Sequence, residues 1–354
     1  MDKPFFVNLD EIEAAAQDYL SPSTYGYYGG YASDGVTHSK NRTAFNDIEL
    51  LPRYMVDVSE RDLSTEMIGQ PMDMPIVVAP MAMMGLAHAE AECGIARACH
   101  EAGITMCMST MSNTSIEDIV KVGANMWFQL YVHKDRGLSQ HLVDRAEAAG
   151  FSALVLTVDV PTGGYRENVM RQPVNIPDSM VLANLVEYWD REKDPDLFSY
   201  VNSQFDPSLT WKDFETFVTS TELPVLVKGI LHPDDAKLAV EHGAAGIIVS
   251  NHGGRQLDTA PASIKALPRI TEAVDGRVDV MMDGGVRRGE DIVKALAYGA
   301  KSVMVGRSIA FALAIGGQAG VTAALGILRK QYDTAMALSG VTSSRSVPRS
   351  LILE

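Results

Sequence analysis

Short apolar segments alternate with helical patterns over most of the chain after residue 74. Each segment is too short for a globular helix, and several are rich in β-branched residues. Runs of this kind, without polar alternation, are typical of parallel strands buried on both faces. We therefore expect eight strands, at PIVVAP (75–80), TMCMS (105–109), MWFQLYV (126–132), ALVLTVD (153–159), PVLVKG (224–229), GIIVSN (246–251), VDVMMDG (278–284) and SVMVGR (302–307).

Helical patterns lie between these strands, and many of them stop at a glycine. A glycine just past the last helical residue can take the left-handed conformation that ends a helix. The clearest cases are 89–102 before Gly103, 135–149 before Gly150, 233–242 before Gly243 and 290–298 before Gly299. Eight βα units predict an α/β fold, most simply a closed (β/α)8 TIM barrel. A doubly wound open sheet is the alternative, but no GxGxxG turn follows the first strand.

Residues 1–74 precede this repeat and predict an N-terminal helical arm. Asn8 or Asp10 can cap a short helix over 11–20, which Ser21-Pro22 would end. The tyrosine and glycine patch at 24–30 either packs the arm onto the barrel or places a tyrosine hydroxyl in a ligand pocket.

The connection after the fourth strand is too long for one loop and one helix. Residues 163–209 are polar, mixed and interrupted by prolines, while aromatic residues within them indicate partial packing. Long loops in compact domains are commonly lids. We expect one domain over 1–354, with an arm (1–74), a barrel (75–320) that carries a lid (163–209), and a C-terminal helix and tail (321–354).

Composition narrows the functional classes. The chain has 354 residues and a formal net charge of -15, which argues against a nucleic-acid binder or a polybasic membrane surface. The three cysteines form no CxxC pair, and no apolar run approaches the roughly 18 residues that cross a membrane. We expect a cytoplasmic protein.

Polar side chains stand at the carboxyl end of nearly every predicted strand. In this fold the active site lies at that end of the barrel. Gln129, Thr157 and Lys228 are the most telling, because polar groups in apolar strands need partners. The full set is the Ala79-Pro80-Met81-Ala82 turn, Ser109, Gln129 with Tyr131, Thr157 with Asp159, Lys228, Ser250 with His252 and Arg255, Asp283, and Gly306 with Arg307.

The stretch SNHGGRQLD (250–258) contains the largest number of residues suited to catalysis or anion binding. Histidine can accept a proton near neutral pH, the glycines let a ligand approach the backbone, and arginine can grip a carboxylate or phosphate. The alternative is a strand end with a structural histidine and a surface arginine.

The last two strand ends, DGGVRRG (283–289) and Gly306-Arg307, lie where barrels commonly hold a phosphate. A phosphorylated sugar or a cofactor would both suit this site. Lys228 is either a Schiff-base nucleophile or a fixed charge beside an anionic ring. Its polar neighbours fit a flat heterocycle with imide edges better, and such a ring with a phosphate tail is FMN.

With these motifs the chain resembles the FMN-dependent 2-hydroxy acid oxidases and dehydrogenases. The segments that carry the resemblance are YGYY, NRTAFNDIELLPR, APMAMMGLAH, WFQLYVHKDR, LTVDVP with GGYRE, LVKGI, SNHGGRQLD and DGGVRRG. Among these, GGYRE, together with APASIKALP and KGILHPDDA, is most similar to the lactate-oxidising members.

The resemblance implies a role for each site residue. His252 would be the general base, with Asp159 orienting it, and Arg166 and Arg255 would clamp the substrate carboxylate. Tyr27 and Tyr131 would bond the substrate oxygens, and Lys228 would stabilise negative charge on the reduced flavin. The expected FMN ligands are Ala79, Pro80, Met81, Ser109, Gln129, Thr157, Lys228 and Ser250 for the ring, and Asp283, Gly285, Arg287, Gly306 and Arg307 for the ribityl phosphate. Met111 stands where glycolate-oxidising members often carry Trp, which disfavours glycolate.

The resemblance thus implies oxidation of a small (S)-2-hydroxy acid, chiefly L-lactate, to the 2-oxo acid, with O2 reduced to hydrogen peroxide. Residues 170–210 lack the apolar membrane segment of quinone-reducing relatives. Alternatives are oxidation of glycolate or a larger, mandelate-like acid, an FMN-dependent isomerase, and a non-catalytic FMN-binding barrel; the last two would not need Arg166, His252 and Arg255 together. No metal, nucleic-acid or membrane partner is expected, and the resemblance implies a homotetramer or octamer.

Overall fold

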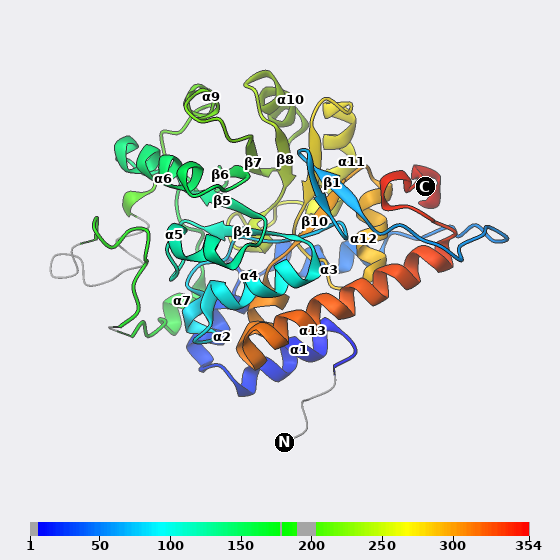
Figure 1. Cartoon of the computed structure of the whole chain (residues 1–354), viewed down its shortest axis with the longest axis horizontal. Coiled ribbons are helices and arrows are strands. Elements are labelled where there is room, and N and C mark those ends of the chain that lie inside the picture. Colours follow the sequence, from blue (N-terminus) through cyan, green and yellow to red (C-terminus); the bar gives the residue numbers. More distant parts are fainter. Residues whose placement is uncertain (1–5, 178, 190–202, 354) are drawn as a thin grey trace.

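Eight parallel strands close into a barrel in the computed structural model, which describes residues 6–177, 179–189 and 203–353 (Figure 1). The strand order around the barrel is β10-β3-β4-β5-β6-β7-β8-β9, so the first and last strands pair and leave no edge. All eight predicted strands and the TIM barrel are confirmed, and the open sheet is excluded. The strands are β3 (Ile76–Val78), β4 (Thr105–Ser109), β5 (Met126–Leu130), β6 (Ala153–Thr157), β7 (Val225–Ile230), β8 (Gly246–Val249), β9 (Asp279–Met282) and β10 (Ser302–Val305).

Alternate side chains on each strand fill two separate cores. On β5, Trp127 points into the barrel interior, and Phe128 packs in the outer core between strands and helices. A hairpin of β1 (Thr65–Met67) and β2 (Gln70–Met72) adds Met67 and Met72 to the interior core. The amino-terminal end of the barrel is therefore filled with apolar side chains, and polar groups are concentrated at the other end.

Helices surround the barrel, and the predicted glycine stops are confirmed. Gly103, Gly150, Gly243 and Gly299 all have positive φ angles, a conformation that costs other residues more. The helices after the strands are α4 (Ala91–Ala102), α5 (Ile116–Ile119), α6 (Arg136–Ala148), α7 (Glu167–Arg171), α9 (Trp211–Thr219), α10 (Pro233–Glu241), α11 (Ser263–Val274), α12 (Gly289–Ala297) and α13 (Arg307–Ser339).

The N-terminal arm contains more helix than the sequence pattern predicts. Helix α1 (Leu9–Ala15) is capped by Asn8, as expected, and a 3-10 turn follows it. Ser21-Pro22 does not simply end that helix: Ser21 caps α2 (Pro22–Gly29), whose first residue is the proline. A third helix, α3 (Val36–Asn46), completes the arm. Glycines and aromatic residues weaken the helical signal of α2, and burial of its tyrosines stabilises it instead.

Helix α13 joins the barrel to the C-terminal tail. It lies against α1, α4 and α12 (Figure 1), and its backbone is non-helical at Gly316 and Gly317. By length and composition it is a candidate membrane span, so the expectation that no apolar run is long enough was wrong. Half of its most apolar window is buried in the protein, and helices that pack in a protein core pass the same test of length and composition.

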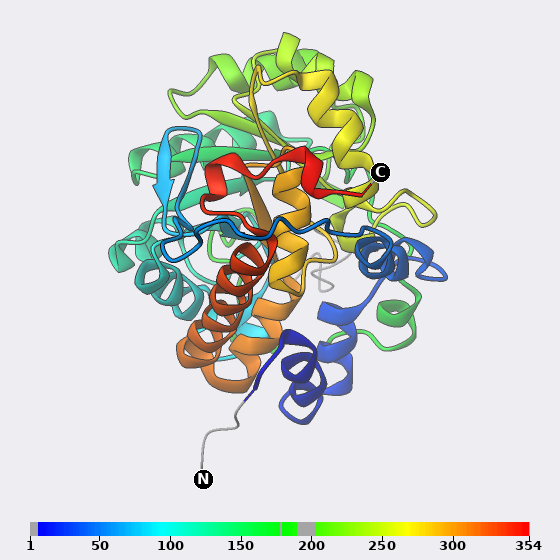
Figure 2. The same ribbon diagram turned by 90° about the vertical axis from the view of Figure 1, so that its right-hand side faces the viewer.

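The C-terminal tail crosses the same face as the segment that leads from α3 to β1 (Figure 2). Leu50 forms an antiparallel bridge with Ile352, and Asp62 pairs with Ser343. Most of the predicted lid is described, including α7, whereas residues 178 and 190–202 lie outside the described residues. Lid motion stays a prediction.

The start of α12 touches the backbone of α13 so closely that only glycine fits. A Cβ on Gly289 would lie 2.2 Å from backbone atoms of Gln331 and Tyr332. We expect Gly289→Ala to destabilise the protein by about 1–3 kcal/mol, as overpacking does. Thermal unfolding should show a lower midpoint.

The matched control is Gly326→Ala, on the exposed side of α13, where a Cβ would meet nothing within 4 Å. It should leave the midpoint unchanged or raise it, because alanine is the better helix former. Equal midpoints for the parent and Gly289→Ala would show that the two helices can separate at little cost.

Candidate active site

A cavity of about 190 Å³ opens at the carboxyl ends of the strands. Most of the predicted site residues line it, although they come from every part of the chain between the arm and α13. Those on its wall are Tyr27, Ala79, Pro80, Met81, Ser109, Met111, Tyr131, Thr157, Arg166, Lys228, His252, Arg255, Asp283, Gly285, Arg287, Gly306 and Arg307.

Three predicted site residues lie behind this wall. Gln129 accepts a hydrogen bond from Ser109 at 3.2 Å, Ser250 accepts one from Lys228 at 2.8 Å, and Asp159 contacts His252. Each therefore supports a residue that does line the cavity.

Other lining residues were missed because nothing in their local sequence separates them from ordinary core. Val160 follows β6, and Phe205 comes from the predicted lid and packs on Tyr131 with ring centroids 4.9 Å apart. Tyr28 was included only as part of the tyrosine patch. Ala82, Gly253, Gly284 and Val286 also line the cavity, and they lie within segments that the sequence singles out, although none of them was assigned a role of its own. The remaining missed residues are Met304, Val305 and Ala310.

Lys228 carries a buried positive charge at the end of β7. Its Nζ lies 2.9 Å from Asp283 Oδ2 and donates to Ser250 Oγ. Burial alone would lower the pKa of Lys228, but the carboxylates of Asp283 and Asp159 more than offset it and raise the pKa above its ordinary value. Lys228 is therefore a fixed cation in the cavity wall.

His252 lies between a carboxylate and a phenol. Its Nδ1 is 3.0 Å from Asp159 Oδ1, and its Nε2 is 3.4 Å from the hydroxyl oxygen of Tyr131. Burial lowers the pKa of His252, and Asp159 only partly opposes this effect, which favours the neutral imidazole that can accept a proton. Burial also raises the pKa of Tyr131 to about 12, which keeps its hydroxyl protonated. This is the arrangement of a base with an orienting carboxylate.

The backbone after β8 bends sharply to present this imidazole. His252 has a φ of 57°, and Gly253 and Gly254 follow with φ of 64° and 76°. Such a conformation is strained for histidine and persists only where neighbours enforce it. The neighbour is Asn251, whose side-chain oxygen accepts from Gly254 N and which exchanges two hydrogen bonds with Asn41 of α3.

Two arginines and a tyrosine form the outer side of the cavity. Nη1 of Arg255 donates to the carbonyl oxygens of Tyr27 and Gly30 at 2.8 and 2.9 Å, and its guanidinium lies 5.5 Å from the Tyr27 ring centroid. Arg166 donates to the carbonyl of Arg255 and to Gln256. Burial, and then Arg166, lower the pKa of Arg255 to about 10, as expected where two cations converge. Such a pair suits a carboxylate.

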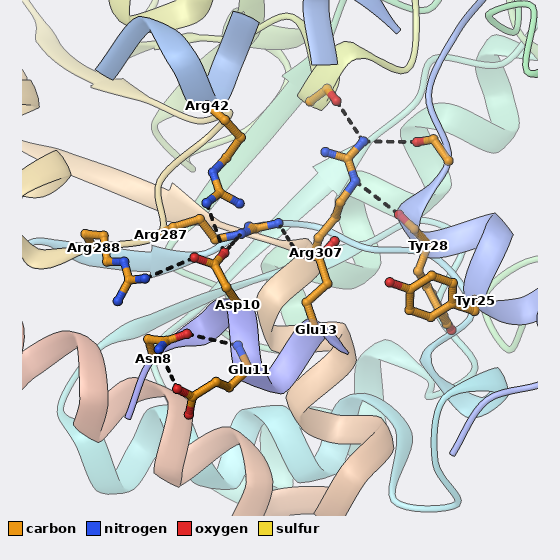
Figure 3. Close-up of polar contacts among 12 residues, drawn as sticks. Asn8, Asp10, Glu11, Glu13, Tyr25, Tyr28, Arg42, Arg287, Arg288 and Arg307 are labelled. Atoms are coloured by element: carbon orange, nitrogen blue, oxygen red, sulfur yellow. Dashed lines mark hydrogen bonds and ion pairs between the residues drawn. The ribbon is translucent and has the colours of Figure 1, made fainter. Parts of the chain in front are cut away.

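A second group of cations lies at the ends of β9 and β10. Arg307 donates to the carbonyl oxygens of Tyr28, Gly30 and Gly253, and Arg287 pairs with Glu13 of α1 (Figure 3). Burial and the neighbouring arginines lower the pKa of Arg307 to about 9. Glycine backbone at Gly284, Gly285 and Gly306 lines the cavity beside these arginines. This end can bind a phosphate.

Several buried polar atoms around the cavity fit a cofactor that is both planar and phosphorylated. Among the described residues, Gln129 Nε2, Thr157 Oγ1, Asp283 Oδ1 and Arg287 Nε are buried without a hydrogen-bond partner. Buried polar groups are normally paired, so these atoms are available to a ligand in the cavity. Thr157 lies opposite Lys228 in the pairing of β6 with β7, and Gln129 is at the same end of the neighbouring strand β5. Arg287 lines the cavity with Arg307. A polar ring edge and a phosphate tail, as in FMN, would fit these two groups of donors.

Comparison with known proteins also indicates an FMN-binding protein. Residues 16–354 match the family model described as FMN-dependent dehydrogenase. The chain is 46% identical to an L-lactate oxidase of Nostoc sp. over 98% of both chains, and 45% identical to a glycolate oxidase of Spinacia oleracea over 98% of this chain and 95% of that one. A crystal structure of mandelate oxidase superposes with a TM-score of 0.91 at 39% identity, covering 99% of this chain and 98% of that one. The chain therefore belongs to the family of FMN-dependent 2-hydroxy acid oxidases.

Proposed function

We propose that this protein oxidises a small (S)-2-hydroxy acid, with L-lactate as the preferred substrate, to the 2-oxo acid and reduces O2 to hydrogen peroxide. The observation that carries the proposal is the convergence of His252, Arg166 and Arg255 on one cavity. The trio supplies a base and two carboxylate-binding cations. An FMN-dependent isomerase or a non-catalytic FMN barrel has no need of it.

The structure supports a division of labour around the substrate. Arg166 and Arg255 hold the substrate carboxylate. Tyr27 and Tyr131 donate hydrogen bonds to the oxygens of the substrate. His252 Nε2 accepts the proton that the substrate loses. This base serves whether that proton leaves the hydroxyl oxygen or the α-carbon. Asp159 then stabilises the imidazolium, because its carboxylate is 3.0 Å from Nδ1.

FMN, when bound, accepts two electrons from the substrate and passes them to dioxygen. Lys228 would hold a positive charge at its ring, with Ala79, Ser109, Gln129, Thr157 and Ser250 forming the rest of the ring site. Asp283, Gly285, Arg287, Gly306 and Arg307 would hold the ribityl phosphate. Oxygen is the proposed acceptor because the Nostoc, Spinacia and mandelate-oxidising relatives are named as oxidases.

The preference for lactate rests on Met111. Its side chain is buried and lines the cavity, and its backbone NH donates to Ser109 Oγ. Methionine is narrow and flexible, so it leaves room for a methyl or larger group on the substrate. The glycolate oxidases and mandelate oxidase are about as similar to the chain as the lactate oxidase is, which makes oxidation of glycolate or a mandelate-like acid the second candidate.

Replacing the base tests the proposed function directly. His252→Gln should retain the absorption spectrum of bound flavin but slow its anaerobic reduction by (S)-lactate by about 100-fold or more, the scale of a lost general base. Stopped-flow absorbance measures this rate. Near-parental reduction in the variant would remove His252 from the mechanism.

Substrate preference is tested at Met111. The parent should use (S)-lactate with a kcat/KM about tenfold above that for glycolate, which is the low end of what one methyl is worth in an apolar pocket. Met111→Trp should reduce activity on lactate, and on larger 2-hydroxy acids, more than on glycolate. Steady-state kinetics on each acid give these values of kcat/KM. The role of Met111 would be contradicted if the parent preferred glycolate, or if Met111→Trp lost the same fraction of activity on every acid.

A further inference from the structure

Arg287 is bound on one side by the N-terminal arm. Its side chain is 8% exposed and lines the cavity, yet its Nη2 donates to Glu13 Oε2 at 2.9 Å. Its Nε is 3.9 Å from Asp10 Oδ1 and has no hydrogen-bond partner among the described residues. The guanidinium therefore has a resident carboxylate on one edge and an unsatisfied donor.

The acidic face of α1 is built for this contact. Asp10 and Glu13 are three residues apart, so they lie on one side of the helix. Besides Arg287, Asp10 contacts Arg42 of α3 at 2.9 Å and Arg288 at 3.1 Å (Figure 3). Leu9 and Ile12 anchor the helix through the outer core. The two carboxylates are therefore held in place by packing as well as by charge.

The carboxylates of α1 offset the repulsion between arginine side chains that lie close together around the cavity. Arg287 is buried, and Arg255 and Arg307 are half-buried beside it. Arg255 and Arg287 both lower the pKa of Arg307, while Glu13 opposes them. Burial lowers the pKa of Arg287 too, and Glu13 is the largest influence that raises it. A buried cation without a nearby anion is costly. Glu13 thus compensates two cations of the predicted phosphate site.

We propose that Glu13 is a built-in counter-ion of the phosphate site and competes electrostatically with the cofactor's phosphate, so that the N-terminal helix sets how tightly the phosphate is held. The proposal rests on the placement of the ribityl phosphate at Arg287 given above. Glu13 lies outside the cavity wall and is a positioning and charge-balancing residue rather than a catalytic one.

The test is binding of FMN and of riboflavin to the cofactor-free protein, followed by flavin fluorescence. Glu13→Gln keeps an oxygen that can accept from Arg287 and removes only the charge. We expect its Kd for FMN to fall by about tenfold, because a repelling charge near the phosphate is lost. The Kd for riboflavin, which lacks the phosphate, should not change. High salt should reduce this gain in FMN affinity, because it screens the repulsion.

A second readout does not depend on cofactor. The cofactor-free Glu13→Gln protein should unfold at a lower temperature than the parent, because Arg287 loses its counter-ion. Asp18→Asn is the matched control: it removes the same charge from an exposed position in the turn after α1, and it should alter neither affinity nor the unfolding temperature.

Unchanged or weaker FMN binding by Glu13→Gln would overturn the proposal, as would an equal gain for FMN and riboflavin. A parent that binds riboflavin as tightly as FMN would instead show that the phosphate has been misplaced, and the counter-ion proposal would fall with that placement.

Discussion

The buried charge of Lys228 is the constraint on which the rest of the site depends. A cation at the end of a barrel strand is stable only with partners, and Asp283 and Ser250 supply them from the ends of β9 and β8. The same charge influences its other neighbours: it helps to lower the pKa of Asp159 and of His252. One lysine thus links the part of the cavity that would hold the flavin ring to the base that would act on the substrate.

Charge balance also explains why the arm belongs to the active site. Arg255, Arg287 and Arg307 all line the cavity, and partners for each of them come from the arm. Helix α1 contributes carboxylates to Arg287, and the carboxyl end of α2 offers backbone carbonyls to Arg255 and Arg307. The partial negative charge of a helix end complements a guanidinium well. The arm therefore completes the site electrostatically, in addition to contributing Tyr27.

The barrel could be predicted from the sequence because short, continuous apolar runs alternate with helical patterns and because glycine stops such as Gly103 take a left-handed backbone. The site followed from polar residues such as Lys228 at strand ends, since a fixed topology brings those ends together. Helix α2 could not be predicted, because packing of its tyrosines outweighs its local propensity. The positions of Val160 and Phe205 in the cavity wall could not be predicted either, because an apolar cavity wall and an apolar core have the same composition.

The contacts of α1 mark another limit of sequence reasoning. Asp10 was expected only as a possible helix cap, and Glu13 had no assigned role, because surface carboxylates on a short helix are ordinary. Their partners lie more than 270 residues away in sequence, at Arg287 and Arg288. Only the folded arrangement shows that these charges meet.

Product stoichiometry in a single turnover distinguishes a flavin oxidase for 2-hydroxy acids from the other candidates. The purified yellow protein is mixed with (S)-lactate without oxygen, the 2-oxo acid is measured, and air is then admitted. We expect bleaching by the (S) but not the (R) enantiomer, with one pyruvate formed per flavin. On admission of air the colour should return rapidly, with one hydrogen peroxide formed per flavin. The proposed function would be contradicted if no 2-hydroxy acid bleached the protein, or if oxygen failed to reoxidise the bleached flavin.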